Sequence, residues 1–274
     1  KEKDWVYIDW ADMDKDGPLC AEQMLYAACF RAMAEISEQL GKDGSVYREE
    51  YEKLTAAIEK FFWDEEKGAY IDSFTSGRRN VTRHANIFAI LFSIADGTKQ
   101  EKILKNVLEN NEIPAITTPY FNFFELDVLC RMGKLAEVLD KIRAYWGGML
   151  DLGAVTFWEE YDPSVPKEEQ YDMYGDHFGK SLCHAWAASP IYFLAKYYAG
   201  LDLVHKDGIT YTLKPQMQYF TELDCTLPVG STGTVRLTWD GKYLEITPDA
   251  DGGILELGEQ KLSLVRGETR RVKI

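Results

Sequence analysis

Apolar residues recur at three- and four-residue spacing over the first part of the chain, which predicts amphipathic helices. The first predicted helix covers residues 19–40 and ends at Gly41, and a short polar turn leads to a second over residues 46–63. The expected buried positions are Leu25, Cys29, Ala32, Ile36 and Leu40 in the first helix, and Tyr47, Tyr51, Leu54, Ile58 and Phe61 in the second. This pattern predicts a helical hairpin.

Two further helix pairs follow, each with one helix that is apolar almost all round and one with a single apolar face. These pairs are residues 82–95 with 99–108, and 119–132 with 135–146. Thr98 and Glu101 have the spacing of a capping box for the second helix of the first pair. Alternation of buried and half-exposed helices is typical of a toroid with inner and outer rings. An α-solenoid would give a similar alternation, but the loops are unequal and no fixed period is visible.

A last helix is predicted over residues 181–199, and the pattern changes after Gly200. Apolar and polar residues then alternate, as in strands, and Asp240-Gly241 has the composition of a hairpin turn. The predicted fold class is mainly α with a C-terminal antiparallel β-sandwich, and the predicted domains are residues 1–202 and 203–274.

Residues 153–190 carry the densest set of groups suited to binding a sugar. Glu159 follows directly after Trp158, and His184 and Trp186 begin the last predicted helix. Nearby lie Asp162 and the aromatic residues Phe157, Tyr161, Tyr171 and Tyr174. Carboxylates and imidazole bind hydroxyls, and flat rings cover the apolar face of a pyranose. The alternative is that Trp158 and Trp186 are core residues and the acids are solvated.

Composition excludes several classes of partner. The chain has 274 residues and a net charge of −14, which argues against nucleic acid and anionic membranes as partners. No apolar run reaches the roughly 18 residues of a membrane span. Five scattered cysteines predict buried thiols, and four histidines without ligand spacing argue against zinc, so no metal or cofactor is expected.

The acidic run after Trp10 has part of the pattern of a calcium-binding loop. Asp12, Asp14 and Asp16 precede Gly17 with the expected spacing. The twelfth position of such a loop is Gln23 rather than glutamate, which argues against calcium binding.

Three motifs occur in an order that resembles a known family. They are Asp9-Trp10, Gly-Ala-Val-Thr-Phe-Trp-Glu at 153–159, and Ser-Leu-Cys-His-Ala-Trp-Ala-Ala-Ser-Pro at 181–190. Together they resemble the α-L-rhamnosidases of glycoside hydrolase family 78, over nearly the whole chain. The resemblance implies a six-hairpin (α/α)6 barrel, only its C-terminal portion being present here, and a β-sandwich after it. It also implies hydrolysis of terminal α-L-rhamnosides with inversion of the anomeric configuration.

The resemblance implies roles for five residues. Glu159 would be the general base that activates water, His184 would contact sugar hydroxyls, and Trp10 would help to wall the sugar pocket. Asp9 and Trp158 carry over as further substrate-binding positions. The expected ligand is a rhamnose-containing glycoside or oligosaccharide.

An inverting glycosidase also needs a general acid, with roughly 6.5–9.5 Å between the two carboxyl groups. In the family this acid lies upstream of the Asp-Trp stretch, and no segment of this chain matches it. About seven helices precede the β module, where six hairpins would supply twelve. We therefore expect a missing N-terminal part as a partner, with self-association as an alternative, and poor hydrolysis by the chain alone. The possible substitute acids are Asp9, Asp12 and Asp14.

Two other classes of function stay open at this point. One is a different (α/α)6 carbohydrate enzyme, such as a trehalase-like or glucuronyl hydrolase. The other is a non-catalytic carbohydrate-binding or structural fragment. The residues leave the linkage, the aglycone and the compartment, whether cytoplasmic or periplasmic and secreted, undecided.

Overall fold

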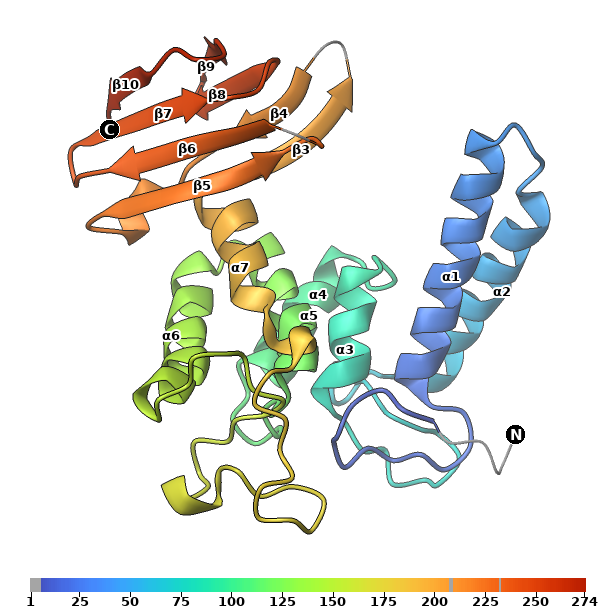
Figure 1. Ribbon diagram of the computed structural model, residues 1–274. Coiled ribbons are helices and arrows are strands. Elements are labelled where there is room, and N and C mark those ends of the chain that lie inside the picture. Colours follow the sequence, from blue (N-terminus) through green and yellow to red (C-terminus); the bar gives the residue numbers. More distant parts are fainter. Residues whose placement is uncertain (1–5, 207–208, 232) are drawn as a thin grey trace. The chain divides into compact units, whose positions relative to one another are not determined.

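The computed structural model describes residues 6–206, 209–231 and 233–274 (Figure 1). The chain divides into two compact units. The first comprises Lys1–Met132 and Tyr145–Ala187, and the second comprises Gly133–Ala144 and Ala188–Ile274. The strands of the β module begin at Leu201. The domain limits expected from sequence, 1–202 and 203–274, stay a prediction.

The first unit begins with the predicted helical hairpin, α1 (Cys20–Gln39) and α2 (Ser45–Phe62). The predicted apolar face of α1 is wrong, because Leu25, Ile36 and Leu40 are 43%, 50% and 66% exposed. The buried positions of α1 are mostly small, namely Cys20, Ala21, Met24, Ala27, Ala34 and Ser37. Small residues let other backbone approach closely: a Cβ on Gly44 would lie 2.7 Å from the carbonyl oxygen of Ala34.

A two-stranded hairpin, β1 (Trp63–Asp64) and β2 (Ala69–Tyr70), leads to α3 (Arg83–Leu91). Every α3 residue from Arg83 to Ile90 is buried, which confirms the prediction that this helix is covered on most sides. The capping box predicted at Thr98 and Glu101 is wrong. Helix α4 (Gly97–Ile103) begins earlier, so the side chain of Asp96 caps it by accepting a hydrogen bond from the Lys99 backbone N–H. A π-helix, η1 (Leu104–Leu108), continues α4.

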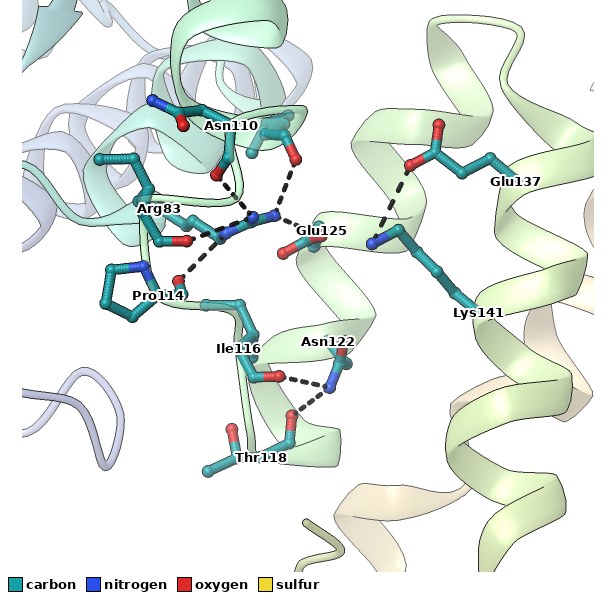
Figure 2. Close-up of polar contacts among 11 residues, drawn as sticks. Arg83, Asn110, Pro114, Ile116, Thr118, Asn122, Glu125, Glu137 and Lys141 are labelled. Atoms are coloured by element: carbon teal, nitrogen blue, oxygen red, sulfur yellow. Dashed lines mark hydrogen bonds and ion pairs between the residues drawn. The ribbon is translucent and has the colours of Figure 1, made fainter. Parts of the chain in front are cut away.

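Helix α5 (Pro119–Arg131) is capped by Thr118, whose side chain accepts a hydrogen bond from the Phe121 N–H. A buried ion pair joins α5 to α3, with Arg83 Nη1 3.0 Å from Glu125 Oε1. The same guanidinium donates to the carbonyl oxygens of Leu108 and Pro114 at 3.0 and 3.1 Å (Figure 2). Arg83, at the start of α3, therefore joins this helix to α5, to the end of η1 and to the loop before α5.

The predicted helix over 181–199 is wrong in its first part. The described structure instead has a 3₁₀ turn, η3 (Ala185–Ala187), then α7 (Ser189–Phe193) and the π-helix η4 (Leu194–Tyr198). Pro190 favours a helix start at this point because its ring cannot follow a helical turn without a clash. Helix α6 (Leu135–Asp151) extends beyond the predicted end at Trp146 and contributes residues to both units.

The second unit holds two four-stranded sheets. One has the order β10 (Arg270–Lys273), β7 (Tyr243–Pro248), β6 (Gly233–Trp239), β5 (Leu223–Val229). The other has the order β3 (Leu201–Lys206), β4 (Ile209–Leu213), β8 (Gly253–Leu257), β9 (Gln260–Leu264). The hairpin predicted at Asp240-Gly241 is confirmed by the pairing of Trp239 with Leu244. The pairs are antiparallel as expected, except that β4 and β8 run parallel.

Apolar residues from both sheets belong to one hydrophobic cluster, as the alternating pattern predicts. Tyr211, Leu213 and Leu255 come from one sheet, and Leu237 and Ile246 from the other. The chain is thus a helical region followed by β-sheets that are almost wholly antiparallel.

The expectation of buried thiols holds only in part. None of the five cysteines, all of which the structure describes, forms a disulfide; Cys20 and Cys130 are buried and Cys225 is half-buried, but Cys29 and Cys183 are exposed. Cys29 is exposed because it lies on the predicted face of α1 that the structure leaves uncovered.

Candidate active site

Glu159 lies in an irregular segment that pairs with a second irregular segment farther along the chain. Gly153, with φ of 91°, turns the chain away after α6. The Glu159 N–H then donates to the Ser181 carbonyl at 2.9 Å, and the His184 N–H donates to the Phe157 carbonyl at 2.8 Å. These two backbone hydrogen bonds bring the predicted base and the predicted sugar-binding histidine together. They also occupy the backbone of residues 181–184, which explains why the helix predicted there does not form.

The Glu159 carboxylate is held at both oxygens. The Tyr174 hydroxyl donates to Oε1 at 2.9 Å, and the Ser181 N–H donates to Oε2 at 3.0 Å. His184 Nδ1 lies 3.9 Å from Oε2. Glu159 is 5% exposed, and the His184 side chain is 32% exposed. A fixed carboxylate beside a half-exposed imidazole suits a general base next to a group that binds hydroxyls.

Aromatic rings surround this carboxylate. Trp186 Nε1 donates to the Glu159 carbonyl at 3.0 Å, and its ring stacks on Tyr120 with centroids 5.4 Å apart. Trp10 meets Trp186 edge-on at 5.1 Å and Tyr174 edge-on at 6.2 Å. The structure therefore brings Trp10, Glu159 and His184 together in one place within the first unit.

Asp9, which precedes Trp10 in the chain, is buried and fixed by hydrogen bonds. It is 2% exposed, accepts a hydrogen bond from the Thr118 hydroxyl at 2.6 Å, and lies 2.9 Å from His84 Nε2. His84 Nδ1 is 3.3 Å from the Thr82 hydroxyl, so the imidazole is fixed on both sides. The proposed contact of Asp9 with substrate stays a prediction, and the observed contacts hold the Trp10 segment in place.

Trp158 packs inside the chain. Its side chain is 3% exposed and meets Tyr171 edge-on with centroids 5.6 Å apart. The substrate-binding role expected for Trp158 stays a prediction, and these contacts are those of a core residue.

A cavity of about 190 Å³ adjoins the Trp10 segment, lined by Asp9, Trp10, Ala11, Asp12, His84 and residues 114–117. Of the possible substitute acids, Asp12 is exposed there. Asp14 instead accepts a hydrogen bond from the Ser76 hydroxyl. A larger hollow of about 370 Å³ on α2 contains none of the predicted site residues. Glu159 lines neither of these two hollows. We place the candidate site at Glu159 because of the hydrogen bonds that fix its carboxylate and the aromatic rings around it.

The electrostatics around Glu159 are dominated by acids. Burial raises the pKa of Glu160, and Lys180 opposes this shift. Burial lowers the pKa of Lys180. Burial, followed by the charge of Asp9, raises the pKa of Tyr7 to about 12. Such surroundings disfavour an anionic ligand and suit a neutral, hydroxyl-rich one.

Sequence reasoning did not identify Tyr174, Ser181, Tyr120 or Tyr7 as site residues. Tyr174 was visible only as one of several aromatics beside acids. The Ser181 contact is made by a backbone N–H, which no residue type reveals. Tyr7 meets Trp10 edge-on and stacks on Tyr120, each with centroids 6.5 Å apart, and these contacts of Tyr7 and Tyr120 arise only in the tertiary fold.

Paired helical hairpins followed by β-sheets, with a carboxylate set among aromatic rings, define a helical-hairpin glycosidase domain. Residues 1–198 match the family model described as the bacterial alpha-L-rhamnosidase 6 hairpin glycosidase domain. The chain belongs to this family.

Solved structures agree with this assignment. A rhamnosidase of glycoside hydrolase family 78 from Bacillus sp. GL1 matches with a TM-score of 0.77 and 24% identity, covering 93% of this chain and 28% of that one. The Klebsiella oxytoca rhamnosidase with rhamnose bound matches with a TM-score of 0.60 and 31% identity, covering 70% of this chain and 36% of that one. The Streptomyces avermitilis α-L-rhamnosidase complexed with L-rhamnose matches with a TM-score of 0.64 and 16% identity, covering 90% of this chain and 24% of that one. None of the curated proteins compared with the chain matches it.

The described residues contain no group of three or more histidine, cysteine or acidic side chains arranged to hold a metal ion. Within the same residues, no helix combines the length and apolar character needed to cross a membrane.

Proposed function

We propose that this chain carries the base-bearing part of an α-L-rhamnosidase, which hydrolyses terminal α-L-rhamnosides with inversion of the anomeric configuration. Glu159 is the general base. The observation that carries the proposal is the fixed Glu159 carboxylate, with Tyr174 on one oxygen and Ser181 on the other, beside His184.

In this mechanism Glu159 takes a proton from water as the water oxygen bonds to the anomeric carbon. The bond from the anomeric carbon to the leaving oxygen breaks on the opposite face, and that oxygen receives a proton from a separate acid. Among the described residues, each carboxylate oxygen of Glu159 accepts one hydrogen bond from the protein. Because a carboxylate oxygen can accept two hydrogen bonds, each oxygen can accept another from a water molecule.

The surroundings of Glu159 suit rhamnose, a deoxysugar with an apolar methyl group at C5. Trp10 and Trp186 offer flat apolar surface for the methyl group and ring. The half-exposed His184 side chain is available to the hydroxyls. The related K. oxytoca and S. avermitilis enzymes were solved with rhamnose, which supports this choice of sugar.

The chain spans 28% of the Bacillus enzyme, so the activity of the whole protein is part of the proposal. We assign the general acid, and the helices that close an (α/α)6 toroid of inner and outer rings, to a longer protein that includes this chain. The two sheets form a β-sandwich that follows the helices.

The test is an assay of a version extended upstream, with 4-nitrophenyl α-L-rhamnoside and 4-nitrophenyl α-D-glucoside as matched substrates. We expect turnover of the rhamnoside only, and β-L-rhamnose as the first product in the NMR spectrum. Release of α-L-rhamnose first would contradict inversion. Rhamnose binding without turnover would instead support a non-catalytic carbohydrate-binding protein.

Replacing His184 with alanine is expected to weaken L-rhamnose binding about fivefold, because one sugar hydrogen bond of about 1 kcal/mol is lost. The melting temperature should change little, since the side chain is 32% exposed. Calorimetric titration and thermal denaturation measure both effects. The matched control is His177→Ala, an exposed histidine paired with Asp172, which should leave binding unchanged. A collapse in melting temperature with unchanged binding would make His184 a core residue.

A further inference from the structure

Tyr174 stands at the tip of a tight hairpin turn. Met173 and Asp176 exchange both backbone hydrogen bonds, at 3.0 and 2.9 Å. The two residues between them both have positive φ, 54° at Tyr174 and 79° at Gly175. This combination is that of a primed hairpin turn, in which the first position disfavours a large side chain such as tyrosine.

Burial does not explain why a tyrosine occupies this position. Tyr174 is 74% exposed, so little of its surface is removed from water. Its described contacts are the edge-on ring contact with Trp10 and the hydroxyl hydrogen bond to Glu159 Oε1. The turn therefore places the Tyr174 hydroxyl within hydrogen-bonding distance of the Glu159 carboxylate. A residue held in a disfavoured backbone conformation is often part of a functional site.

We propose that Tyr174 is a positioning residue for the base, and that the Tyr174-Gly175 turn exists to hold its hydroxyl on Glu159. The inference rests on the proposed function of Glu159. Tyr174 fixes Oε1 and the Ser181 N–H fixes Oε2, so the plane of the carboxylate is set from two sides. A base oriented in advance loses less entropy when the water molecule reacts.

The groups that face this carboxylate differ in how they act. Glu160, Lys180 and Tyr7 interact with its charge through space, and His184 lies 3.9 Å away. Partial desolvation of the hydroxyl, and then the hydrogen bond to Glu159, raise the pKa of Tyr174, so its phenol keeps its proton and remains a donor. Among the hydrogen bonds of the described residues, the one that a side chain donates to the Glu159 carboxylate comes from Tyr174, whereas Trp186 donates to the Glu159 backbone carbonyl.

The test is Tyr174→Phe in the extended enzyme, which removes only the hydroxyl. We expect kcat for an aryl rhamnoside to fall about 10- to 100-fold, the range for one hydrogen bond to a charged group. KM should stay within about twofold, because the lost interaction orients the base rather than the substrate. The matched control is Tyr171→Phe, in the same loop with its ring on Trp158 and Phe178, which should keep normal kinetics.

A double-mutant comparison separates positioning from a structural role. In a Glu159→Gln background, Tyr174→Phe should cause no further loss of kcat, since there is no base left to orient. A loss that persists in that background, or a rise in KM at constant kcat, would overturn the inference.

The turn itself is tested at Gly175. A Cβ there meets no atom within 4 Å, so substitutions probe backbone conformation without a clash. Gly175→Asn, which tolerates positive φ, should keep kcat, and Gly175→Val should reproduce the loss of Tyr174→Phe. Equal rates for the two Gly175 variants would contradict a role for the turn.

Failure of this inference is distinguishable from failure of the proposed function. A normal rate in Glu159→Gln would show that Glu159 is not the base, and Tyr174 would then have no base to position. A large loss in Glu159→Gln, together with a normal kcat in Tyr174→Phe, would overturn the positioning role alone.

Discussion

Replacing Glu159 with glutamine is expected to lower the turnover of α-L-rhamnosides by about 10²–10⁴-fold, the usual contribution of a general base. This loss corresponds to about 3–5 kcal/mol of activation free energy. Glutamine keeps the size of the side chain but cannot take a proton from water. Initial rates with an aryl rhamnoside, in a version of the protein extended upstream, measure the effect.

The fold should survive this substitution because both anchors of the carboxylate tolerate an amide. The amide oxygen can accept the Ser181 N–H, and the amide nitrogen can donate to the Tyr174 hydroxyl, which is an acceptor as well as a donor. The melting temperature and circular dichroism spectrum should therefore match those of the parent protein. A fall in both rate and stability would leave the role of base unsupported.

Glu160→Gln is the matched control, because this half-buried carboxylate directly follows Glu159 in the chain. We expect its rate to stay within a few-fold of the parent. A normal rate in Glu159→Gln together with a large loss in Glu160→Gln would move the base by one residue. Azide should also restore turnover of an activated rhamnoside in Glu159→Ala, since a small anion can replace the activated water.

The sequence was sufficient to predict the helices with strong apolar spacing. The limits of α1, α2 and α5 agree with prediction to within a residue or two. Gly41, with positive φ, follows the end of α1, and the Thr118 side chain caps α5 just before Pro119. The buried face of α1 was not predictable in the same way. Periodicity identifies an apolar face, but which face a neighbour covers depends on small residues such as Ala27 and Ala34.

The helix expected over 181–199 shows a second limit of local reasoning. The apolar spacing of Leu182 and Trp186 favours a helix, yet the backbone of Ser181 and His184 bonds to the segment around Glu159 instead. Hydrogen bonds between segments far apart in sequence decide the outcome here, and no local pattern reveals them. The candidate site shares this limit, because motifs predict Glu159, while the turn that carries Tyr174 is visible only in three dimensions.

Replacing Arg83 with methionine is expected to lower the free energy of unfolding by about 3–5 kcal/mol, the usual cost of breaking a buried ion pair at one partner. Arg83 and Glu125 are 5% and 3% exposed, so the carboxylate would be left in a poorly solvated place. The carbonyls of Leu108 and Pro114 would lose their donor as well (Figure 2). Urea unfolding measures the change as a lower midpoint at an unchanged slope.

Two further variants test whether charge, rather than lost packing, causes this instability. Adding Glu125→Gln to Arg83→Met removes the buried negative charge that has lost its ion pair with Arg83, so the double variant should regain part of the stability. Recovery should be incomplete, because the loop carbonyls still lack their donor. Arg48→Met breaks an exposed pair with Glu38 in the same unit and should cost less than about 1 kcal/mol. If Arg83→Met costs no more than Arg48→Met, the buried pair does not hold α3, α5 and the intervening loop together.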